Sequence, residues 1–301
     1  MKKILSILFL FSIAFLVYAF NPIYKRGIIT IDTVILLGQS NVWGGTNQAA
    51  PLTYTNTQVN TFVYLKPDLT YANTGRLQYY RQGLNNNQDN SGLSQVGPDI
   101  SLGYNYFQMT GKQLLIIKYA RSGSSLIDDG VGAFTNGLWQ IDADSTRSFG
   151  LIHYRNLIHK ILIPCIQQCA ARDIKLNIIS NIWGQGESEA SAALALTSYT
   201  SRYKTEFIRL HEAIKTSLTP YNVLSPSFKP LIMKLHNSFT PGTRPSLALI
   251  KQSQDSICTY YNCQKINTDT FRKASDSTHF SAVGSISFGY MAAYYLANFY
   301  Q

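Results

Sequence analysis

Several signatures of common enzyme classes are absent from this sequence. It has no Gly-x-Ser-x-Gly segment, which argues against the nucleophile turn of the common α/β-hydrolases. His-Glu-x-x-His, Cys-x-x-Cys, Gly-x-x-x-x-Gly-Lys and Gly-x-Gly-x-x-Gly are also missing, and these patterns mark zinc, redox, phosphate and dinucleotide sites. We therefore expect no metal and no nucleotide or redox cofactor.

A dense run of basic residues is absent as well, although the chain is basic overall. Lys and Arg number 26 against 16 Asp and Glu, a net charge of +10, or +8 once Lys2 and Lys3 are subtracted. Nucleic-acid binding usually requires a clustered basic patch, whereas these charges are scattered. We expect no nucleic-acid partner, and we interpret the net charge as favouring general solubility and attraction to anionic polysaccharide.

The N-terminus carries a long apolar run. Met1-Lys2-Lys3 precedes an almost wholly apolar stretch over residues 4–20, and Val17-Tyr18-Ala19 fits a cleavage site. We expect residues 1–19 to be a secretory signal peptide, so that the mature protein is secreted or extracytoplasmic with no stable membrane association. The alternative is an uncleaved membrane anchor, for which the run falls just short of the ~20 residues of a spanning helix.

The remaining chain shows no linker rich in Pro, Gly or Ser, no repeat and no charged tail. We therefore expect residues 20–301 to form a single domain.

Four cysteines in an exported chain raise the question of disulfides. Cys258 and Cys263 would close a small loop, and Cys165 and Cys169 lie four apart in a predicted helix. Cross-pairing of the two sets is the alternative, and the sequence leaves the pairing open.

Apolar and helix-like segments alternate along the chain. Residues 34–37 form an unbroken apolar run, which is typical of a strand buried on both faces. The alternation predicts an α/β protein with a parallel sheet of about five strands, covered by helices on both faces. The predicted strands are 34–37, 62–65, 114–119, 176–183 and 231–235. The predicted helices are 99–110, 151–172, 198–217, 246–256 and 282–299.

A serine directly follows the first predicted strand. Gly38-Gln39-Ser40-Asn41 begins where the apolar run ends, and open α/β folds bind ligands at the carboxyl ends of their strands. A serine hydroxyl is a weak nucleophile, so it needs a base, an orienting carboxylate and donors for the oxyanion. The segment is a candidate nucleophile site. The alternative is a polar turn whose serine caps the next helix.

The segment Asp276-Ser277-Thr278-His279 supplies a base and a carboxylate. Its first and last residues are three apart, so a helical turn would place them on one face, with the imidazole N–H donating to the carboxylate. The alternative is a helix N-terminus capped by Asp276 or Ser277. No carboxylate is so placed beside the other histidines, which are His153, His159, His211 and His236.

Two further polar segments follow predicted strands. They are Arg121-Ser122-Gly123-Ser124-Ser125 and Trp183-Gly184-Gln185-Gly186-Glu187-Ser188. Because parallel strands end at one edge of a sheet, we expect Ser40, Gly123 and Gln185 to meet there.

Together, and in this order, the four segments resemble the blocks of the SGNH (GDSL-like) hydrolases. They are most similar to the sialate O-acetylesterase and acetylxylan esterase branch, carbohydrate esterase family six. The resemblance runs from about residue 32 to the C-terminus and implies a three-layer, flavodoxin-like fold. It also implies the catalytic residues Ser40 (nucleophile), His279 (general base and acid) and Asp276 (orienting carboxylate). The implied oxyanion hole comprises the backbone N–H groups of Ser40 and Gly123 and the side-chain amide of Gln185.

The sequence departs from the family pattern at two points. Many members have asparagine as the third oxyanion donor, where this chain has Gln185, as in the sugar-acetylesterase branch. Ser122 stands where that branch often has a second glycine, which leaves the depth of the acyl pocket open.

Gln39 and Glu187 are expected to support the catalytic residues. Glu187 either holds the Ser40 loop or orients His279. We favour the first role, because Asp276 already fills the orienting position.

The sequence therefore predicts a secreted serine esterase that removes O-acetyl groups from a carbohydrate through an acetyl-enzyme on Ser40. The sugar, whether xylan, sialic acid or another glycan, stays open. The alternatives are a lipid or acyl-ester hydrolase of the same fold and a non-catalytic glycan-binding surface protein. Polar segments 46–61 and 85–94 read as loops that favour a sugar over a lipid. The candidate sugar contacts are Trp43, Tyr119, Arg121 and Trp139, the last equally suited to the core.

Overall fold

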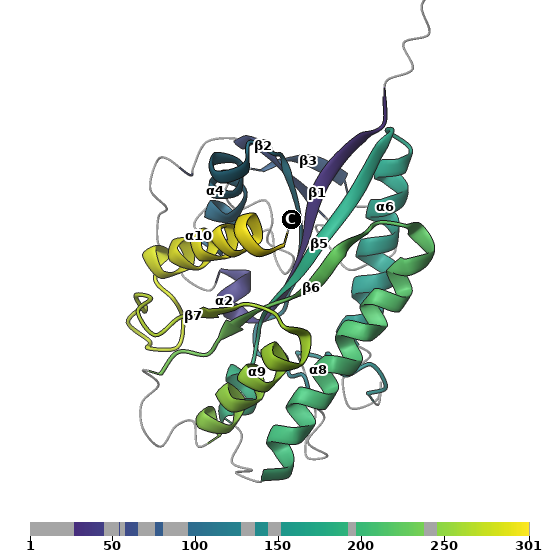
Figure 1. Cartoon of the computed structure of the whole chain (residues 1–301). Coiled ribbons are helices and arrows are strands. Elements are labelled where there is room, and N and C mark those ends of the chain that lie inside the picture. Colours follow the sequence, from purple (N-terminus) through teal and green to yellow (C-terminus); the bar gives the residue numbers. More distant parts are fainter. Residues whose placement is uncertain are drawn as a thin grey trace, which may run out of the picture.

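A computed structural model of the chain describes residues 27–44, 54, 58–65, 76–80, 96–127, 136–143, 152–191, 197–237 and 246–300. The described residues form one seven-stranded sheet in the order β3-β2-β4-β1-β5-β6-β7 (Figure 1). Six strands are parallel, and β3 alone pairs antiparallel, with β2. The α/β class with a parallel sheet is confirmed, and the sheet is wider than the five strands predicted, because β3 and β7 add to them.

Each predicted strand lies largely within a longer observed one. β1 is buried on both faces from Ile31 onward, which fits its place in the middle of the sheet. Hydropathy detected only the most apolar part of each strand and missed polar flanks such as the first half of β6. The strands are β1 (Ile29–Gly38), β2 (Gln58–Leu65), β3 (Arg76–Tyr80), β4 (Leu114–Ala120), β5 (Ile174–Gly184), β6 (Leu224–Lys234) and β7 (Lys265–Asn267).

The predicted polar loop 46–61 is wrong at its end, where residues 58–61 begin β2. Gln58 donates to the Ile100 carbonyl at 2.7 Å and accepts from the Thr61 hydroxyl at 3.2 Å. These polar side chains are therefore satisfied inside the protein, which a hydropathy pattern does not register. Residues 46–53, 55–57 and 85–94 lie outside the described residues.

Helices cover both faces of the sheet. α4 and α10 pack against each other on one face, while α6, α8 and α9 cover the other (Figure 1). The predicted helix 151–172 is a continuous run of α5, η1 and α6, in which η1 has π-helical hydrogen bonding. The helices are α2 (Ser40–Trp43), α4 (Asp99–Thr110), α5 (His153–Asn156), η1 (Leu157–Leu162), α6 (Ile163–Ala170), α7 (Glu187–Ser191), α8 (Thr197–Leu218), η2 (Thr219–Tyr221), α9 (Leu247–Tyr261) and α10 (Ala282–Phe299).

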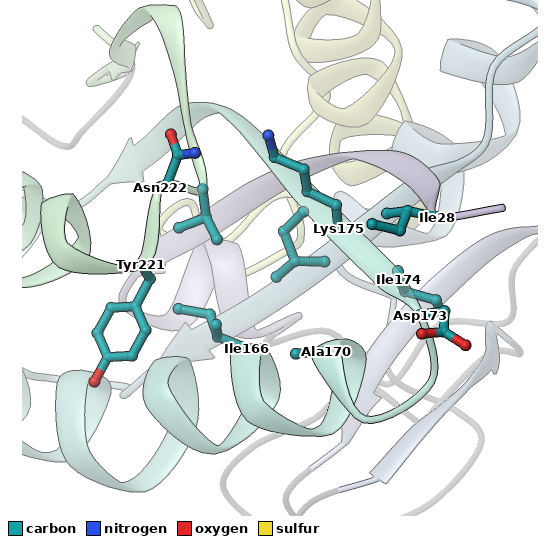
Figure 2. A pocket seen from close by; sticks show the side chains of 10 residues that line it. Ile28, Ile166, Ala170, Asp173, Ile174, Lys175, Tyr221 and Asn222 are labelled. Carbon is teal, nitrogen blue, oxygen red and sulfur yellow. The ribbon is translucent and has the colours of Figure 1, made fainter.

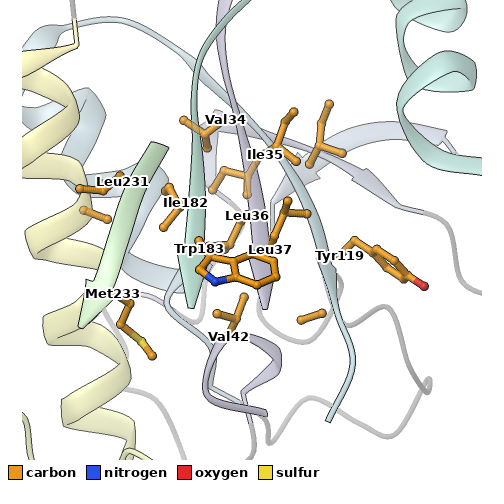
Figure 3. Packing of buried hydrophobic residues seen from close by; sticks show 14 of the residues in the cluster. Val34, Ile35, Leu36, Leu37, Val42, Tyr119, Ile182, Trp183, Leu231 and Met233 are labelled. Carbon is orange, nitrogen blue, oxygen red and sulfur yellow. The ribbon is translucent and has the colours of Figure 1, made fainter. Parts of the chain in front are cut away.

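The short helix α2 packs against the buried residues at the carboxyl edge of the sheet. Val42 of α2 is fully buried and lies close to Trp183 and Leu37 (Figure 3). A Cβ on Gly38 would lie 2.7 Å from Val42 Cγ2, and one on Gly184 would lie 2.4 Å from it. Glycine at both strand ends therefore lets Val42 of α2 pack directly on the sheet. Burial of this side chain contributes about 2 kcal/mol to the stability of the fold.

The four cysteines are free thiols in this structure, with Cys165, Cys169 and Cys258 buried and Cys263 partly buried. Within the described ranges, no helix combines the length and the apolar character needed to cross a membrane. Residues 1–19, the predicted signal peptide, lie outside those ranges.

Candidate active site

Three neighbouring strands end together at one edge of the sheet. Gly38 of β1 lies opposite Ala120 of β4 on one side and opposite Gly184 of β5 on the other. The pairing continues past the strands, because the Gln39 N–H donates to the Gly184 carbonyl at 3.1 Å and the Arg121 N–H donates to the Gly38 carbonyl at 3.0 Å. The segments that follow these strands therefore converge at one edge, as their order in the sequence suggested.

Ser40 is the first residue of α2, which starts two residues after β1. Gln39 occupies the N-cap position and makes no side-chain cap, so Ser40 is not the cap of this helix. Only 4% of Ser40 is exposed. Because it is the first helical residue, its N–H has no carbonyl partner within the helix.

Lys118 of β4 binds the last residue of α2. Its Nζ atom donates to the Trp43 carbonyl at 2.9 Å and to Asp99 Oδ1 at 2.7 Å. Both charged side chains are almost fully buried, at 2% and 4% exposed. The helix that carries Ser40 is therefore bound to β4 by a hydrogen bond from a buried lysine, itself paired with Asp99 of α4, which the sequence analysis did not single out.

Asp276 and His279 lie together in a turn that precedes α10. Asp276 Oδ2 is 2.5 Å from His279 Nδ1, and Asp276 Oδ1 accepts the backbone N–H groups of Thr278 and His279, both at 2.9 Å. The segment is not helical, and Ser277 has a positive φ of 57°. One carboxylate thus closes the turn and binds the imidazole. The N-cap of α10 is Ser281, so the alternative of a helix N-terminus capped by Asp276 or Ser277 is wrong.

The same contacts set the ionisation of Asp276. Burial raises the pKa of this carboxyl, but hydrogen bonds from the backbone and imidazole of His279 and from the Thr278 N–H outweigh it and lower the pKa to about 2. The carboxylate is therefore ionised at any pH near neutrality. With Nδ1 engaged, Nε2 is the imidazole nitrogen left to exchange a proton with a reacting group.

Asn41, next to Ser40 in the chain, contacts the backbone on both sides of His279. Its Oδ1 accepts the Phe280 N–H at 2.8 Å, and its Nδ2 donates to the Thr278 carbonyl at 3.3 Å. The same Nδ2 donates to Glu187 Oε1 at 2.6 Å. Asn41 was part of the Gly-Gln-Ser-Asn segment but was not itself predicted as a site residue.

Gly123 follows β4 in an exposed turn with a φ of +68°. This left-handed conformation favours glycine. A Cβ here would lie 2.7 Å from Asn136 Nδ2, so the Asn136 amide borders the space beside Gly123. The backbone N–H of Gly123 is thus on a surface that a substrate can reach, with a polar side chain next to it.

Gln185 lies immediately after β5, as expected, but its side chain turns inward. It is fully buried, and its Nε2 atom donates to the Ser124 carbonyl at 3.3 Å and to Glu189 Oε2. Its Oε1 accepts from the Tyr203 hydroxyl at 3.1 Å. Both amide hydrogens are therefore engaged, and in this arrangement Gln185 presents no free donor to an oxyanion, unlike its expected role.

Glu189 holds the loop that follows β4. Its Oε1 accepts the Leu126 N–H, and the Ile127 N–H lies 3.4 Å away. Burial raises the pKa of this carboxyl to about 7, although the hydrogen bonds from Leu126 and Gln185 act in the opposite direction. The sequence gave no signal for this role, because Glu189 lies in no recognised motif.

Three consecutive residues of α7 therefore contact the loops of the site. Glu187 binds Asn41, the Ser188 hydroxyl donates to Gln39 Oε1 at 3.3 Å, and Glu189 binds the loop after β4. The carboxylate that contacts His279 is Asp276, whereas Glu187 accepts a hydrogen bond from Asn41, next to Ser40.

Two of the candidate sugar contacts belong to the core. Tyr119 and Trp139 are 1% and 0% exposed, and both rings pack on His153. Burial lowers the pKa of His153 to about 4, so this imidazole is neutral near pH 7. Its Nε2 lies 2.8 Å from the Asn136 carbonyl, which can only accept, so Nε2 carries the proton and Nδ1 accepts from the Tyr119 hydroxyl at 2.7 Å.

The remaining two candidates, Trp43 and Arg121, are partly buried. Both lie at the carboxyl edge of the sheet, at the end of α2 and directly after β4. They stay candidates for contact with a substrate.

A cavity of about 350 Å³ lies at the opposite edge of the sheet (Figure 2). Its lining includes Ile174 at the start of β5 and Val223 just before β6, with Ile166 from α6. No residue of the Ser40, Gly123 or His279 segments borders it. The cavity is therefore remote from the candidate catalytic groups.

The described part of the chain contains no group of three or more His, Cys, Asp or Glu residues arranged to hold a metal ion. The arrangement at the carboxyl edge is instead a serine, an imidazole bound to a carboxylate, and backbone N–H groups. Such a set supports attack by an activated hydroxyl on a carbonyl carbon.

Comparison with protein families identifies one that spans most of the chain. Residues 30–298 match the model of a family described as carbohydrate esterase, sialic acid-specific acetylesterase. No curated protein matches the chain in sequence.

Solved structures share the fold. The chain is similar to a protein of Arabidopsis thaliana, with 16% identity, a TM-score of 0.60, and coverage of 89% of this chain and 98% of that one. It is also similar to NanS, with 11% identity, a TM-score of 0.58, and coverage of 90% and 96%. A carbohydrate acetylesterase from Xanthomonas citri has 14% identity and a TM-score of 0.55, and the match covers 89% of this chain and 56% of that one. At these identities the likeness shows the fold alone.

Proposed function

We propose that this chain, which belongs to the family of carbohydrate esterases described as sialic acid-specific acetylesterases, removes acetyl groups from a carbohydrate through an acetyl-enzyme on Ser40. The family makes it a carboxylic ester hydrolase. The roles of individual residues, the acetyl-enzyme and the sugar substrate are our proposal.

In the first half of the reaction, Ser40 Oγ attacks the acetyl carbonyl carbon while His279 Nε2 takes the hydroxyl proton. The bond between this carbon and the sugar oxygen then breaks, and His279 returns the proton to the departing sugar hydroxyl. Asp276 keeps the imidazole in the required tautomer, because its carboxylate accepts the Nδ1 proton.

In the second half, water replaces the sugar. His279 Nε2 takes a proton from the water as its oxygen attacks the acetyl carbon. The bond to Ser40 Oγ breaks, the proton passes back to that oxygen, and acetate leaves.

For the oxyanion we propose the backbone N–H groups of Ser40 and Gly123. Ser40 offers the free N–H of a first helical residue, and Gly123 is exposed at the end of the neighbouring strand. Gln185 was expected as a third donor. Because its amide binds Ser124 and Glu189, we assign it to holding the Gly123 turn in place.

One observation carries this proposal: an Asp276–His279 pair and Ser40 are joined through a single side chain, Asn41, at the edge where β1, β4 and β5 end. A non-catalytic glycan-binding protein has no need for an imidazole held by a carboxylate 2.5 Å away.

The test is acetate release from a panel of acetylated xylan fragments, sialic acids and other acetylated sugars, alongside simple esters of increasing acyl length. We expect acetate from at least one glycan and none from the Ser40→Ala variant. We also expect kcat/KM to fall as the acyl chain lengthens, because the Asn136 amide borders Gly123 and offers no apolar lining.

The lipid hydrolase alternative gives the opposite trend. Each CH₂ buried in an apolar groove adds about 0.8 kcal/mol to binding, so a lipolytic enzyme improves with chain length. A rate that climbs with acyl length and no acetate from any glycan would favour that alternative.

We further propose that the protein is exported and that residues 1–19 are removed, on the pattern of Lys2, Lys3 and the apolar run that follows. Expression of the full chain in a secreting host, followed by N-terminal sequencing, tests this. A mature protein that begins near residue 20 is expected, whereas intact protein retained in the membrane fraction supports an anchor.

A further inference from the structure

We infer that Asn41 is a positioning residue that sets the placement of the base relative to the nucleophile. The inference rests on the proposed function, because it assigns Asn41 to the transfer of a proton between Ser40 and His279. Asn41 is not proposed to touch the substrate or the reacting atoms.

The argument begins with what Asn41 joins. It is bonded covalently to Ser40 and binds the peptide groups on both sides of His279, through the Phe280 N–H at 2.8 Å and the Thr278 carbonyl at 3.3 Å. Ser40 and His279 are 239 residues apart in sequence. A single side chain, 2% exposed, therefore connects the nucleophile segment to the base segment.

The orientation of the Asn41 amide follows from its partners. The Phe280 N–H requires an acceptor, which must be Oδ1, while the Thr278 carbonyl and the Glu187 carboxylate require donors, which must be the two hydrogens of Nδ2. Both hydrogens and the oxygen of the amide are thus engaged. Glu187 prevents a flip of the amide, because a flip would set Oδ1 against its carboxylate.

The rest of the His279 turn is held without Asn41. The His279 N–H binds Asp276 Oδ1, the Ala274 N–H donates to the His279 carbonyl at 2.8 Å, and Lys273 Nζ reaches the Thr278 carbonyl at 3.1 Å. Loss of the Asn41 amide should therefore leave the turn folded but free to shift relative to α2. A misplacement of about 1 Å costs a catalyst on the order of 10²-fold in rate.

The experiment compares Asn41→Ala with a matched control, Asn105→Ala. Asn105 is also a buried asparagine, at 8% exposed, whose amide donates to a main-chain carbonyl, Ser101, at 2.7 Å within α4. With p-nitrophenyl acetate as substrate, we expect Asn41→Ala to lower kcat about 10²-fold with little change in KM. Asn105→Ala should stay within about twofold of the parent kcat.

Two further variants test the amide chemistry. Asn41→Asp keeps the acceptor for Phe280 but sets an oxygen against Glu187, so we expect a kcat at least as low as that of Asn41→Ala. In the double variant Asn41→Asp with Glu187→Gln, the side-chain amide introduced at position 187 can donate to the carboxylate introduced at position 41. Part of the lost kcat should therefore return. Urea unfolding of each variant identifies any loss that comes from misfolding.

A double-mutant cycle with His279→Ala separates positioning from a merely structural role. If Asn41 acts through His279, then Asn41→Ala should have no further effect on the residual kcat once the imidazole is gone. An unchanged kcat in Asn41→Ala, or the same fold-loss with and without His279, would overturn the inference. Retained activity in Ser40→Ala would instead overturn the proposed function, so the two failures are distinguishable.

Discussion

The Oδ2 atom of Asp276 lies 2.5 Å from the Nδ1 atom of His279, while the other oxygen of the same carboxylate accepts the His279 N–H. The imidazole is thereby held both at its ring and at its backbone by one residue three positions earlier. Asp276 is the carboxylate that contacts this ring in the described part of the chain.

Replacing the orienting carboxylate should weaken catalysis in a recognisable way. Asp276→Asn removes a negative charge beside the imidazole, so the protonated ring loses its stabilising partner. We expect kcat to fall by about 10⁴. His279→Ala should be more damaging, by about 10⁶.

The Glu187→Gln variant provides the comparison. Because Glu187 binds Asn41 rather than the imidazole, kcat should fall less in Glu187→Gln than in Asp276→Asn. A larger loss in Glu187→Gln would reverse the assignment of the orienting carboxylate.

The buried carboxyl of Glu189 predicts a pH dependence of stability. Its pKa is raised from 4.5 to about 7 in the folded protein, so between these values the folded state binds a proton more readily than the unfolded chain. The contribution to stability is full below pH 4.5 and is lost as the pH rises through 7. The loss amounts to roughly 3 kcal/mol.

Glu189→Gln removes this titration. The free energy of unfolding of the parent should therefore fall relative to that of the variant as the pH increases from 4.5 to 7. The hydrogen bonds lost in the variant add a difference that does not depend on pH. Urea titrations at several pH values measure it. Parallel stability curves for parent and variant would show that Glu189 does not titrate in this window.

Breaking the buried ion pair between Lys118 and Asp99 should greatly lower the free energy of unfolding. Lys118→Met leaves the Asp99 carboxylate buried without its cation and the Trp43 carbonyl without its donor. Breaking a buried pair on one side costs about 3–5 kcal/mol. Urea unfolding should show this loss for Lys118→Met and a smaller one for Lys118→Met combined with Asp99→Asn. Equal losses in the two variants would contradict the account.

The sequence was sufficient for the features that depend on local pattern and chain order. Apolar runs located five of the seven strands, and the rule that parallel strands end at one edge brought the Ser40, Gly123 and Gln185 segments together. The Asp276–His279 pairing followed from a spacing of three residues, although the segment is a turn rather than a helix.

The features that the sequence did not predict depend on the direction in which side chains point. Gln185 follows β5 as expected, yet Glu189 and Tyr203 draw its amide into the interior, and neither partner lies in a recognised motif. Tyr119 seemed suited to a sugar, but it lies in a strand buried along its whole length. Lys118 was the one visible signal missed, since it is the only charged residue in the apolar strand Leu114–Ala120.

The central claim is that Ser40 carries the acetyl group, and the most direct measurement is to find that group on the protein. Enzyme mixed with an acetyl ester is quenched in acid within one turnover, digested, and mapped by mass spectrometry, with Ser40→Ala treated in parallel. We predict acetylation on the peptide that contains Ser40 in the parent and none in the variant, whose turnover falls by about 10⁶. An acetyl group on a different residue, or normal turnover by folded Ser40→Ala, would contradict the account.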